Sequence, residues 1–273
     1  MKLIVLGSGT SHGIPVVGCD CPVCCSGDPR DKRMRASLYI EGAGGERAVI
    51  DTGPEFRLQA IRAGITRLDA LFLTHSHADH IHGLDDLRPL CYEQPLPVYG
   101  NRQTLAELRE RFSYVFKETQ QGGGKPRIVL HTARGQVRLG GLTFTPVPVK
   151  HGGLAILGWK ITQAGKEGDP AVYLTDVSHI PQGSLERIRH PAVLFIGGLR
   201  ARPHETHFTF SQALRTARSL GAKQTYLTHI CHEHSHRDIE EYCRTFQEYP
   251  PSRAEYLPAG TEEPAYDGLE LTL

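Results

Sequence analysis

Short runs of apolar and β-branched residues recur along the chain, each bounded by glycine, proline or polar residues. Runs of this kind are typical of β-strands that pack into a protein core. We therefore predict strands at Leu3–Leu6, Ser37–Ile40, Ala48–Ile50, Ala70–Leu73, Thr143–Val149, Ala171–Thr175, Val193–Ile196 and Thr225–Thr228.

Other stretches carry apolar residues at helical spacing, which indicates helices with one buried face. They predict helices at Glu55–Ala63, Gln103–Phe112, Ser211–Leu220 and Ile239–Phe246. Ser211 is a candidate N-terminal cap for the third of these helices. Strands and helices alternate in two successive groups, so the pattern favours an α/β protein with two packed sheets covered by helices on the outside.

The composition is ordinary for a globular protein, with 39% hydrophobic and 22% charged residues in a chain of 273. No low-complexity linker divides the sequence, so we expect a single domain over residues 1–273. Thirty-one Lys and Arg residues against thirty Asp and Glu residues leave a net charge of +1. This balance gives no strong field for a polyanion, so a small substrate fits better than long nucleic acid.

The first residues, Met1–Gly7, hold one lysine and a short apolar run that ends at glycine. This run is too short for the core of a signal peptide or for a membrane span. We therefore expect a cytoplasmic protein with no membrane segment. A homodimer is compatible with these features, and the sequence does not decide the oligomeric state.

A dense group of potential metal ligands follows the predicted strand Ala70–Leu73, in the order Thr74-His75-Ser76-His77-Ala78-Asp79-His80. Because one residue separates His75 from His77, an extended turn can direct both imidazoles at one cation. Asp79 and His80 continue into the next turn and can face a second cation. Imidazole and carboxylate suit Zn²⁺ and, less selectively, Mn²⁺ or Fe²⁺.

Three further candidate ligands stand at the ends of other predicted strands, namely His151, Asp176 and His229. Each alone would mean little, but together they supply the donors that the first group lacks. The seven donors complete a site for two metal ions if Asp176 bridges them.

The motif from His75 to His80, followed by His151, Asp176 and His229, resembles the metallo-β-lactamase superfamily over nearly the whole chain. The resemblance implies an αββα sandwich of two mixed β-sheets flanked by helices, with the site along one edge of the sheets. It also implies two ligand sets: His75, His77 and His151 for one metal, and Asp79, His80 and His229 for the other, with Asp176 between them.

A second candidate site lies in Cys19-Asp20-Cys21-Pro22-Val23-Cys24, where closely spaced thiols can wrap one zinc ion. A structural zinc needs four protein ligands, and His232 is our candidate for the fourth. Such a site would tie the N-terminal loop to the C-terminal half of the chain. The remaining cysteines would be free thiols with packing as their expected role: Cys25, Cys91, Cys231 and Cys243.

The glycine-rich opening Leu6–Gly13, the segment Gly18–Cys24 and the motif Thr74–His80 resemble the phosphoribosyl cyclic phosphate phosphodiesterases of phosphonate breakdown. The resemblance implies hydrolysis of a small phosphodiester, such as a cyclic sugar or nucleotide phosphate. In such enzymes a histidine between the bridging aspartate and the last metal-binding histidine acts as general acid, which implies His207 rather than His204. Asp79 is expected to serve catalysis as well as metal binding. The residues that precede His207 differ from the family pattern, so the natural substrate stays open.

The hypothesis is therefore a hydrolase with two divalent cations, zinc or manganese, in its reaction centre and one structural zinc in the cysteine cluster. Metal binding lowers the pKa of water from about 15.7 to about 7, and His207 would protonate the leaving alkoxide. Arg33, Arg200 and Arg202 are candidates to bind a second, non-reacting phosphate through bidentate guanidinium contacts. The competing expectation for each arginine is a solvated surface charge, as for the whole basic stretch Asp28–Arg35.

Two alternatives belong to the same superfamily. One is a nuclease of the tRNA 3′-end processing type, which needs a basic tRNA-clamping insertion that neither the net charge nor any segment supplies. The other is a non-hydrolytic binding protein that resembles the quinone-cofactor biosynthesis protein with a cysteine-rich N-terminal clip.

Overall fold

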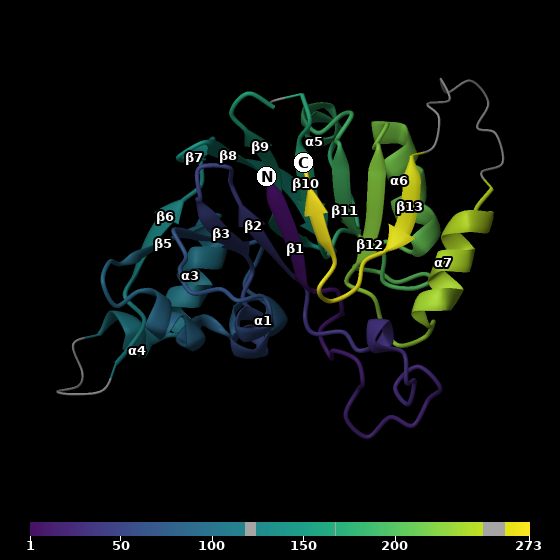
Figure 1. Ribbon diagram of the computed structural model, residues 1–273, viewed down its shortest axis with the longest axis horizontal. Coiled ribbons are helices and arrows are strands. Elements are labelled where there is room, and N and C mark those ends of the chain that lie inside the picture. The colour runs from purple at the N-terminus through teal and green to yellow at the C-terminus, as the bar shows by residue number, and fades with distance from the viewer. Residues whose placement is uncertain (118–123, 167, 248–259) are drawn as a thin grey trace.

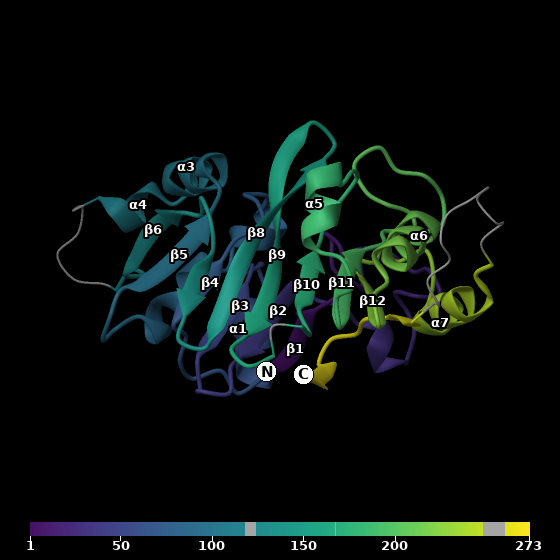
Figure 2. The ribbon, with the colours of Figure 1, turned by 90° about the horizontal axis from the view of Figure 1, so that it is seen from above.

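The computed structural model describes residues 1–117, 124–166, 168–247 and 260–273. These residues form two seven-stranded sheets that pack face to face, with helices on the outer faces (Figures 1 and 2). The predicted α/β class and αββα sandwich are confirmed. Within the described ranges, no helix combines the length and the apolar character needed to cross a membrane.

The first sheet has the strand order β14-β1-β2-β3-β4-β5-β6. Its strands are β1 (Lys2–Gly7), β2 (Ser37–Glu41), β3 (Arg47–Ile50), β4 (Ala70–Phe72), β5 (Leu96–Gly100), β6 (Ile128–Thr132) and β14 (Glu270–Thr272). The sheet is mixed, because β14, β1, β2 and β3 pair antiparallel whereas β3 to β6 run parallel. The pairing of β1 with β14 brings the two termini side by side (Figure 1).

The second sheet has the order β13-β12-β11-β10-β9-β8-β7. Its strands are β7 (Val137–Leu139), β8 (Leu142–His151), β9 (Leu154–Gln163), β10 (Ala171–Leu174), β11 (Val193–Gly197), β12 (Gln224–Thr228) and β13 (Thr261–Pro264). This sheet is also mixed, since β10 to β13 run parallel and β7 to β10 pair antiparallel.

The helices are α1 (Phe56–Arg62), α2 (Ala78–Ile81), α3 (Arg102–Arg111), α4 (Ser113–Phe116), α5 (Gln182–Arg187), α6 (Phe210–Leu220) and α7 (His236–Thr245), with short 3-10 helices at Pro29–Asp31 and Leu84–Leu90. The four predicted helices correspond to α1, α3, α6 and α7. The cap prediction is wrong: Thr209, not Ser211, caps α6, because Thr209 and Gln212 exchange side-chain and backbone hydrogen bonds in a capping box.

Residues of one strand alternate between two cores. In β1, Leu3 and Val5 face the other sheet, whereas Ile4 and Leu6 pack in the cluster beneath α1 and α3. Phe72 of β4 stacks on Phe144 of β8 across the sandwich, with ring centroids 3.8 Å apart. Burial on both faces explains why most of the predicted strands are continuous apolar runs, whereas β8 alternates buried residues with more exposed ones.

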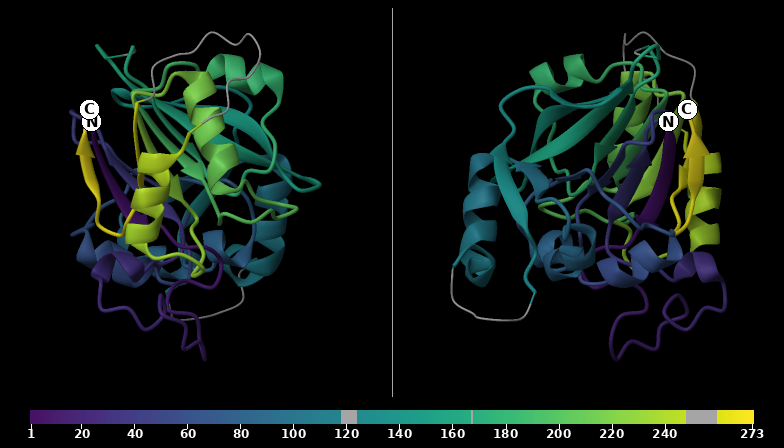
Figure 3. Two further views of the ribbon diagram at one scale, coloured as in Figure 1. Left: turned by 90° about the vertical axis from the view of Figure 1, so that its right-hand side faces the viewer. Right: turned by 60° about the vertical axis from the view of Figure 1, so that its left-hand side comes forward.

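The long loop between β1 and β2 projects from one end of the sandwich (purple in Figures 1 and 3). It pairs with the C-terminal half through a bridge between Gly9 and Ile230. Two hydrogen bonds hold this bridge, from Thr10 N to Ile230 O at 3.1 Å and from Ile230 N to Ser8 O at 3.0 Å. The loop therefore lies beside the residues that follow β12.

Candidate metal centre and active site

The ends of four strands bring the predicted ligands together. All seven lie at such ends: His75, His77, Asp79 and His80 after β4, His151 at the end of β8, Asp176 after β10 and His229 after β12. Helix α2 begins at Ala78, so its first turn carries Asp79 and His80. Sequence positions far apart in the chain thus converge on one centre.

The donor atoms fall into two groups, and within each group they lie no more than 4.8 Å apart. The first group is His75, His77 and His151, and the second is Asp79, His80, Asp176 and His229. This is the division that the superfamily resemblance implies. Asp176 also lies within 4.8 Å of a donor atom of His151, so it stands between the two groups as a bridging ligand must.

The second group is buried and tightly packed. His80 Nε2 lies 3.1 Å from a carboxylate oxygen of both Asp79 and Asp176, and His229 Nε2 lies 3.1 Å from Asp176 Oδ1. Burial raises the pKa of both carboxyl groups, but His80 and His229 outweigh it and hold each pKa below the usual range. Both aspartates are therefore carboxylates, the form that binds a metal.

The donor set fits divalent cations. Among the described residues, two buried ring nitrogens of the donor groups, His75 Nε2 and His80 Nε2, find no hydrogen-bond partner. Burial and the charge of His80 lower the pKa of His75, which leaves its imidazole neutral. Neutral imidazole and carboxylate are the donors that zinc and related cations take, so cations would satisfy these nitrogens.

Two residues of the centre, and Asp51, which contacts His80, have a backbone that non-glycine residues rarely adopt. The φ angles of Asp51, Asp176 and His229 are 62°, 55° and 56°, each just beyond the end of a strand. A left-handed residue of this kind costs about 1–3 kcal/mol and persists where the surroundings enforce it, which is typical of functional sites.

Comparison with known proteins places this centre in a family. A family model described as a beta-lactamase superfamily domain matches residues 46–230, the range that holds all seven donors. A solved structure of a diphosphatase from the PhnP family is 40% identical, with a TM-score of 0.84, and the match covers 100% of this chain and 97% of that one. The chain belongs to the β-lactamase superfamily, in its PhnP family.

Of two further relatives, one is much longer than this chain and the other shares only its fold. An octanoyltransferase of Porphyromonas gingivalis is 40% identical over 99% of this chain, but the chain spans only 51% of that longer protein. Zinc-bound PqqB from Methylobacterium extorquens shares the fold, with a TM-score of 0.79 at 18% identity over 100% of both chains. The superfamily and the two donor groups support a metal-dependent hydrolase that binds divalent cations.

Asp51 belongs to the centre but lies outside the predicted set of ligands. Its Oδ2 accepts a hydrogen bond from His80 Nδ1 at 2.8 Å, and its Oδ1 accepts one from Thr74 N at 2.8 Å. Contacts of this kind fix the orientation of a ligating histidine. Asp51 follows the strand Ala48–Ile50 directly, as the other site residues follow theirs, and that position could have revealed it.

His207 covers the metal centre. Its ring stacks on His229 with centroids 4.9 Å apart, and its Nδ1 lies 3.9 Å from Asp176 Oδ1. Burial and the charge of His229 lower its pKa to about 3. His204 is exposed, with its ring 5.0 Å outward from that of His207. His207 is therefore the histidine placed to reach a reacting group, and donor atoms of His151, Asp176 and His207 also lie within 4.8 Å of one another.

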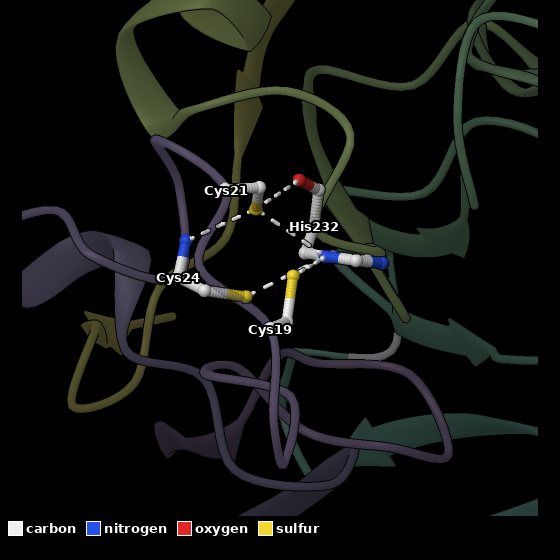
Figure 4. A group of neighbouring side chains, drawn as sticks. All are labelled: Cys19, Cys21, Cys24 and His232. Carbon is white, nitrogen blue, oxygen red and sulfur yellow. Dashed lines mark hydrogen bonds between the residues drawn. The ribbon is translucent and has the colours of Figure 1, made fainter.

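The predicted cysteine cluster forms around His232. The Sγ atoms of Cys19, Cys21 and Cys24 lie 3.4, 3.5 and 3.5 Å from His232 Nδ1 (Figure 4). A tetrahedral zinc bound by sulfur at about 2.3 Å and by nitrogen at about 2.0–2.1 Å separates these donors by about 3.5 Å. A backbone hydrogen bond from Cys24 lowers the pKa of Cys21 to about 6, which favours the thiolate. The four donors thus fit one zinc ion.

Of the other cysteines, Cys91, Cys231 and Cys243 are buried, as expected for packing residues. Cys25 is exposed, so packing is the wrong expectation for it. Cys25 also lies outside the cluster of Cys19, Cys21, Cys24 and His232.

The structure separates the candidate arginines. Both expectations for Arg33, a solvated charge and a phosphate ligand, are wrong. Arg33 is 2% exposed and donates hydrogen bonds to Ser8 Oγ and to Ala265 O. Arg200 and Arg202 lie in the segment that leads to His207, and both donate to the carboxylate of Glu233. Their guanidinium groups therefore have a protein partner already.

Arg35, from the same basic stretch, lies near Asp79 of the metal centre. It forms an ion pair with Glu55, and its Nε donates to Ser11 O at 3.0 Å. Burial lowers the pKa of Arg35, and the nearby carboxylate of Asp79 opposes this shift. Arg35 is a functional candidate that charge patterning alone cannot distinguish from Arg30 or Arg33.

Proposed function

We propose that this chain is a dinuclear metal-dependent phosphodiesterase that hydrolyses a small phosphodiester, a cyclic sugar or nucleotide phosphate. One observation carries the proposal: two complete donor groups meet at Asp176, and the ring of His207 covers the place where they meet. A site for two cations with an adjacent proton donor suits hydrolysis at phosphorus.

Divalent cations held by the two groups would activate a water molecule and neutralise charge on the phosphate oxygens. The chain's own residues supply the remaining chemistry. His207 is neutral in the free site because burial lowers its pKa to about 3. An anionic phosphodiester beside the ring favours the protonated form, and that proton can pass to the leaving oxygen.

His151 and Thr206 would hold the proton donor in place. His151 Nδ1 donates to Thr206 O at 2.8 Å, so the residue before His207 is anchored to a ligand of the first group. Phe208 N donates to Val177 O at 2.7 Å, which anchors the residue after His207 to the neighbour of Asp176. His207 is thus fixed on both sides relative to the centre.

A diphosphate is the second candidate substrate. The solved relative of the PhnP family is described as a diphosphatase, and it is 40% identical over nearly its whole length. Both substrates undergo attack at phosphorus, but the leaving group of a diphosphate is a phosphate anion that needs protonation less. The net charge of +1 argues against a tRNA substrate, and the complete donor set favours a hydrolase over a binding protein.

A substrate panel tests the proposal. Purified protein with quantified metal is assayed against cyclic and linear phosphodiesters, diphosphates, thioesters, lactams and tRNA precursors. We expect metal-dependent turnover of a small phosphodiester, with slower turnover of the other classes. Turnover of diphosphates alone would replace the first candidate by the second. Turnover confined to a thioester, a lactam or tRNA would contradict the proposal.

A further inference from the structure

One short segment, residues 229–233, serves both candidate metal sites. It begins at His229 of the metal centre and contains His232 of the cysteine cluster. The next residue, Glu233, faces the loop that carries His207. We call residues 199–208 the His207 loop. Its ends meet through a hydrogen bond from Leu199 N to Phe208 O at 3.0 Å.

Glu233 holds the outer part of the His207 loop. Its Oε1 accepts a hydrogen bond from Arg200 Nη1 at 2.9 Å, and its Oε2 accepts one from Arg202 Nε at 2.8 Å. The side chains of Arg200 and Glu233 are 16% and 26% exposed, so this contact is half-buried rather than freely solvated. Charge-assisted pairs with this geometry are stronger than neutral hydrogen bonds.

A backbone contact runs beside these side chains. Cys231 N donates to Leu199 O at 3.0 Å. The segment 229–233 therefore contacts the start of the His207 loop through its backbone as well as through the side chain of Glu233. The inner part of the loop is anchored at Thr206 and Phe208 to the metal centre. His207 therefore lies between an anchor at the metal centre and an anchor at Glu233.

We propose that Glu233 is a positioning residue, which acts through Arg200 and Arg202 to transmit the geometry of the cysteine cluster to His207. The proposal rests on the role of His207 in the proposed function. The cluster fixes His232, the next residue presents its carboxylate to both arginines, and the arginines fix the loop. A structural cluster thereby sets the position of the proton donor.

Glu233→Gln tests the proposal, with Glu241→Gln as its matched control. Glu241 also pairs with an arginine, Arg244, but on the exposed surface of α7. Turnover is measured on one diester with an alkoxide leaving group and on one activated aryl diester, with bound metal quantified. Hydrogen exchange of residues 199–208 is followed by mass spectrometry.

We expect Glu233→Gln to slow the alkoxide diester roughly 10-fold, a part of the roughly 10²–10⁴-fold that general acid catalysis contributes. The aryl diester should change less than about twofold, since it needs no proton donor. Exchange in the His207 loop should become faster with metal content unchanged. Adding Arg200→Gln should cause little further loss, because the two residues act as one unit. Glu241→Gln should behave as the unmodified protein.

The link to the cysteine cluster has its own readout. Cys21→Ser should speed exchange in the His207 loop, and combining it with Glu233→Gln should add little. Cys19→Ser serves as the second variant if Cys21→Ser does not fold. Unchanged loop exchange in the cluster variants would overturn the link.

Other outcomes separate this proposal from the proposed function. If Glu233→Gln matches Glu241→Gln in exchange and in both rates, Glu233 does not position the loop. If Glu233→Gln instead lowers the KM for phosphodiesters, the carboxylate of Glu233 keeps Arg200 and Arg202 from binding phosphate, and the proposal is overturned. If His207→Ala is not selective for the alkoxide diester while loop exchange still responds to Glu233→Gln, the role of His207 fails and the coupling stands.

Discussion

His80 and Asp51 form a hydrogen bond of 2.8 Å between two side chains that are wholly shielded from solvent. The bond uses His80 Nδ1, so His80 Nε2 points toward Asp79 and Asp176. Thr74 adds two hydrogen bonds to the carboxylate of Asp51, which fixes it in turn. Asp51 therefore determines how a residue of the second donor group presents its ligand atom.

Asp51→Asn should weaken metal binding at the centre by about 10–100-fold, the usual effect of losing such an outer contact. The amide cannot offer two carboxylate oxygens to His80 and Thr74. Metal retained after dialysis against graded chelator concentrations measures the effect. Asp85→Asn, which breaks an exposed pair with Arg88, is the control. Equal metal affinity in both variants would show that Asp51 is not needed to orient His80.

The fully loaded protein should contain three metal ions per chain, because the structure presents two donor groups that share Asp176 and a separate cysteine cluster. Elemental analysis of protein purified in zinc- and manganese-supplemented medium measures the number. Two or fewer ions in a saturated sample would refute the three-ion count.

Cys21→Ser should lower the melting temperature while the catalytic pair still binds metal, because a structural zinc contributes folding free energy. Differential scanning calorimetry with parallel metal analysis provides the measurement. Cys25→Ser is the matched control, since Cys25 is exposed and lies outside the cluster. An unchanged melting temperature together with lost turnover would place Cys21 in the chemistry instead.

The stability of the protein should fall in mild acid partly because of His236. Its Nδ1 accepts a hydrogen bond from Arg33 Nη2 at 3.1 Å, and burial together with the charge of Arg33 lowers its pKa to about 4. An unfolded histidine titrates near pH 6.5, so between about pH 6.5 and 4 the unfolded chain binds a proton that the folded chain does not. The free energy of unfolding therefore falls as the pH drops through this window.

His236→Gln should flatten this pH dependence. Melting temperatures between pH 7 and pH 5 are compared for the unmodified protein, for His236→Gln and for the exposed control His131→Gln. Metal loss in acid affects all three proteins alike, so the difference between them isolates His236. Parallel curves for all three would mean that His236 does not carry a lowered pKa.

The strands β4, β10 and β12 were predictable because each is largely buried on both faces, whereas β8 alternates buried residues with more exposed ones. In β1, Leu3 faces the other sheet while Ile4 faces the helices, so the apolar run is unbroken. The pattern does not reveal β13 (Thr261–Pro264), an edge strand of largely polar residues that ends in proline. Edge strands tolerate such residues, and they therefore lack the apolar pattern of a buried strand.

The candidate metal ligands were predictable because four of them are closely spaced in His75–His80 and the other three stand at strand ends. Other contacts between distant segments were not predictable. Arg33 is separated by 203 positions from His236, and nothing near it in sequence distinguishes this buried arginine from the half-buried Arg30. The pairing of Glu233 with Arg200 was not predictable for the same reason, since only the fold brings these two residues together.

The central claim is that a two-metal centre hydrolyses a phosphodiester with His207 as the proton donor, and one comparison tests it most directly. Turnover of an alkoxide diester and of an activated aryl diester is measured for His207→Ala and for the unmodified protein, with bound metal quantified in both. General acid catalysis contributes roughly 10²–10⁴-fold, so we expect a loss of that size on the alkoxide diester only, with both centre metals retained. An equal loss on both substrates, loss of a metal ion, or no loss at all would contradict this account.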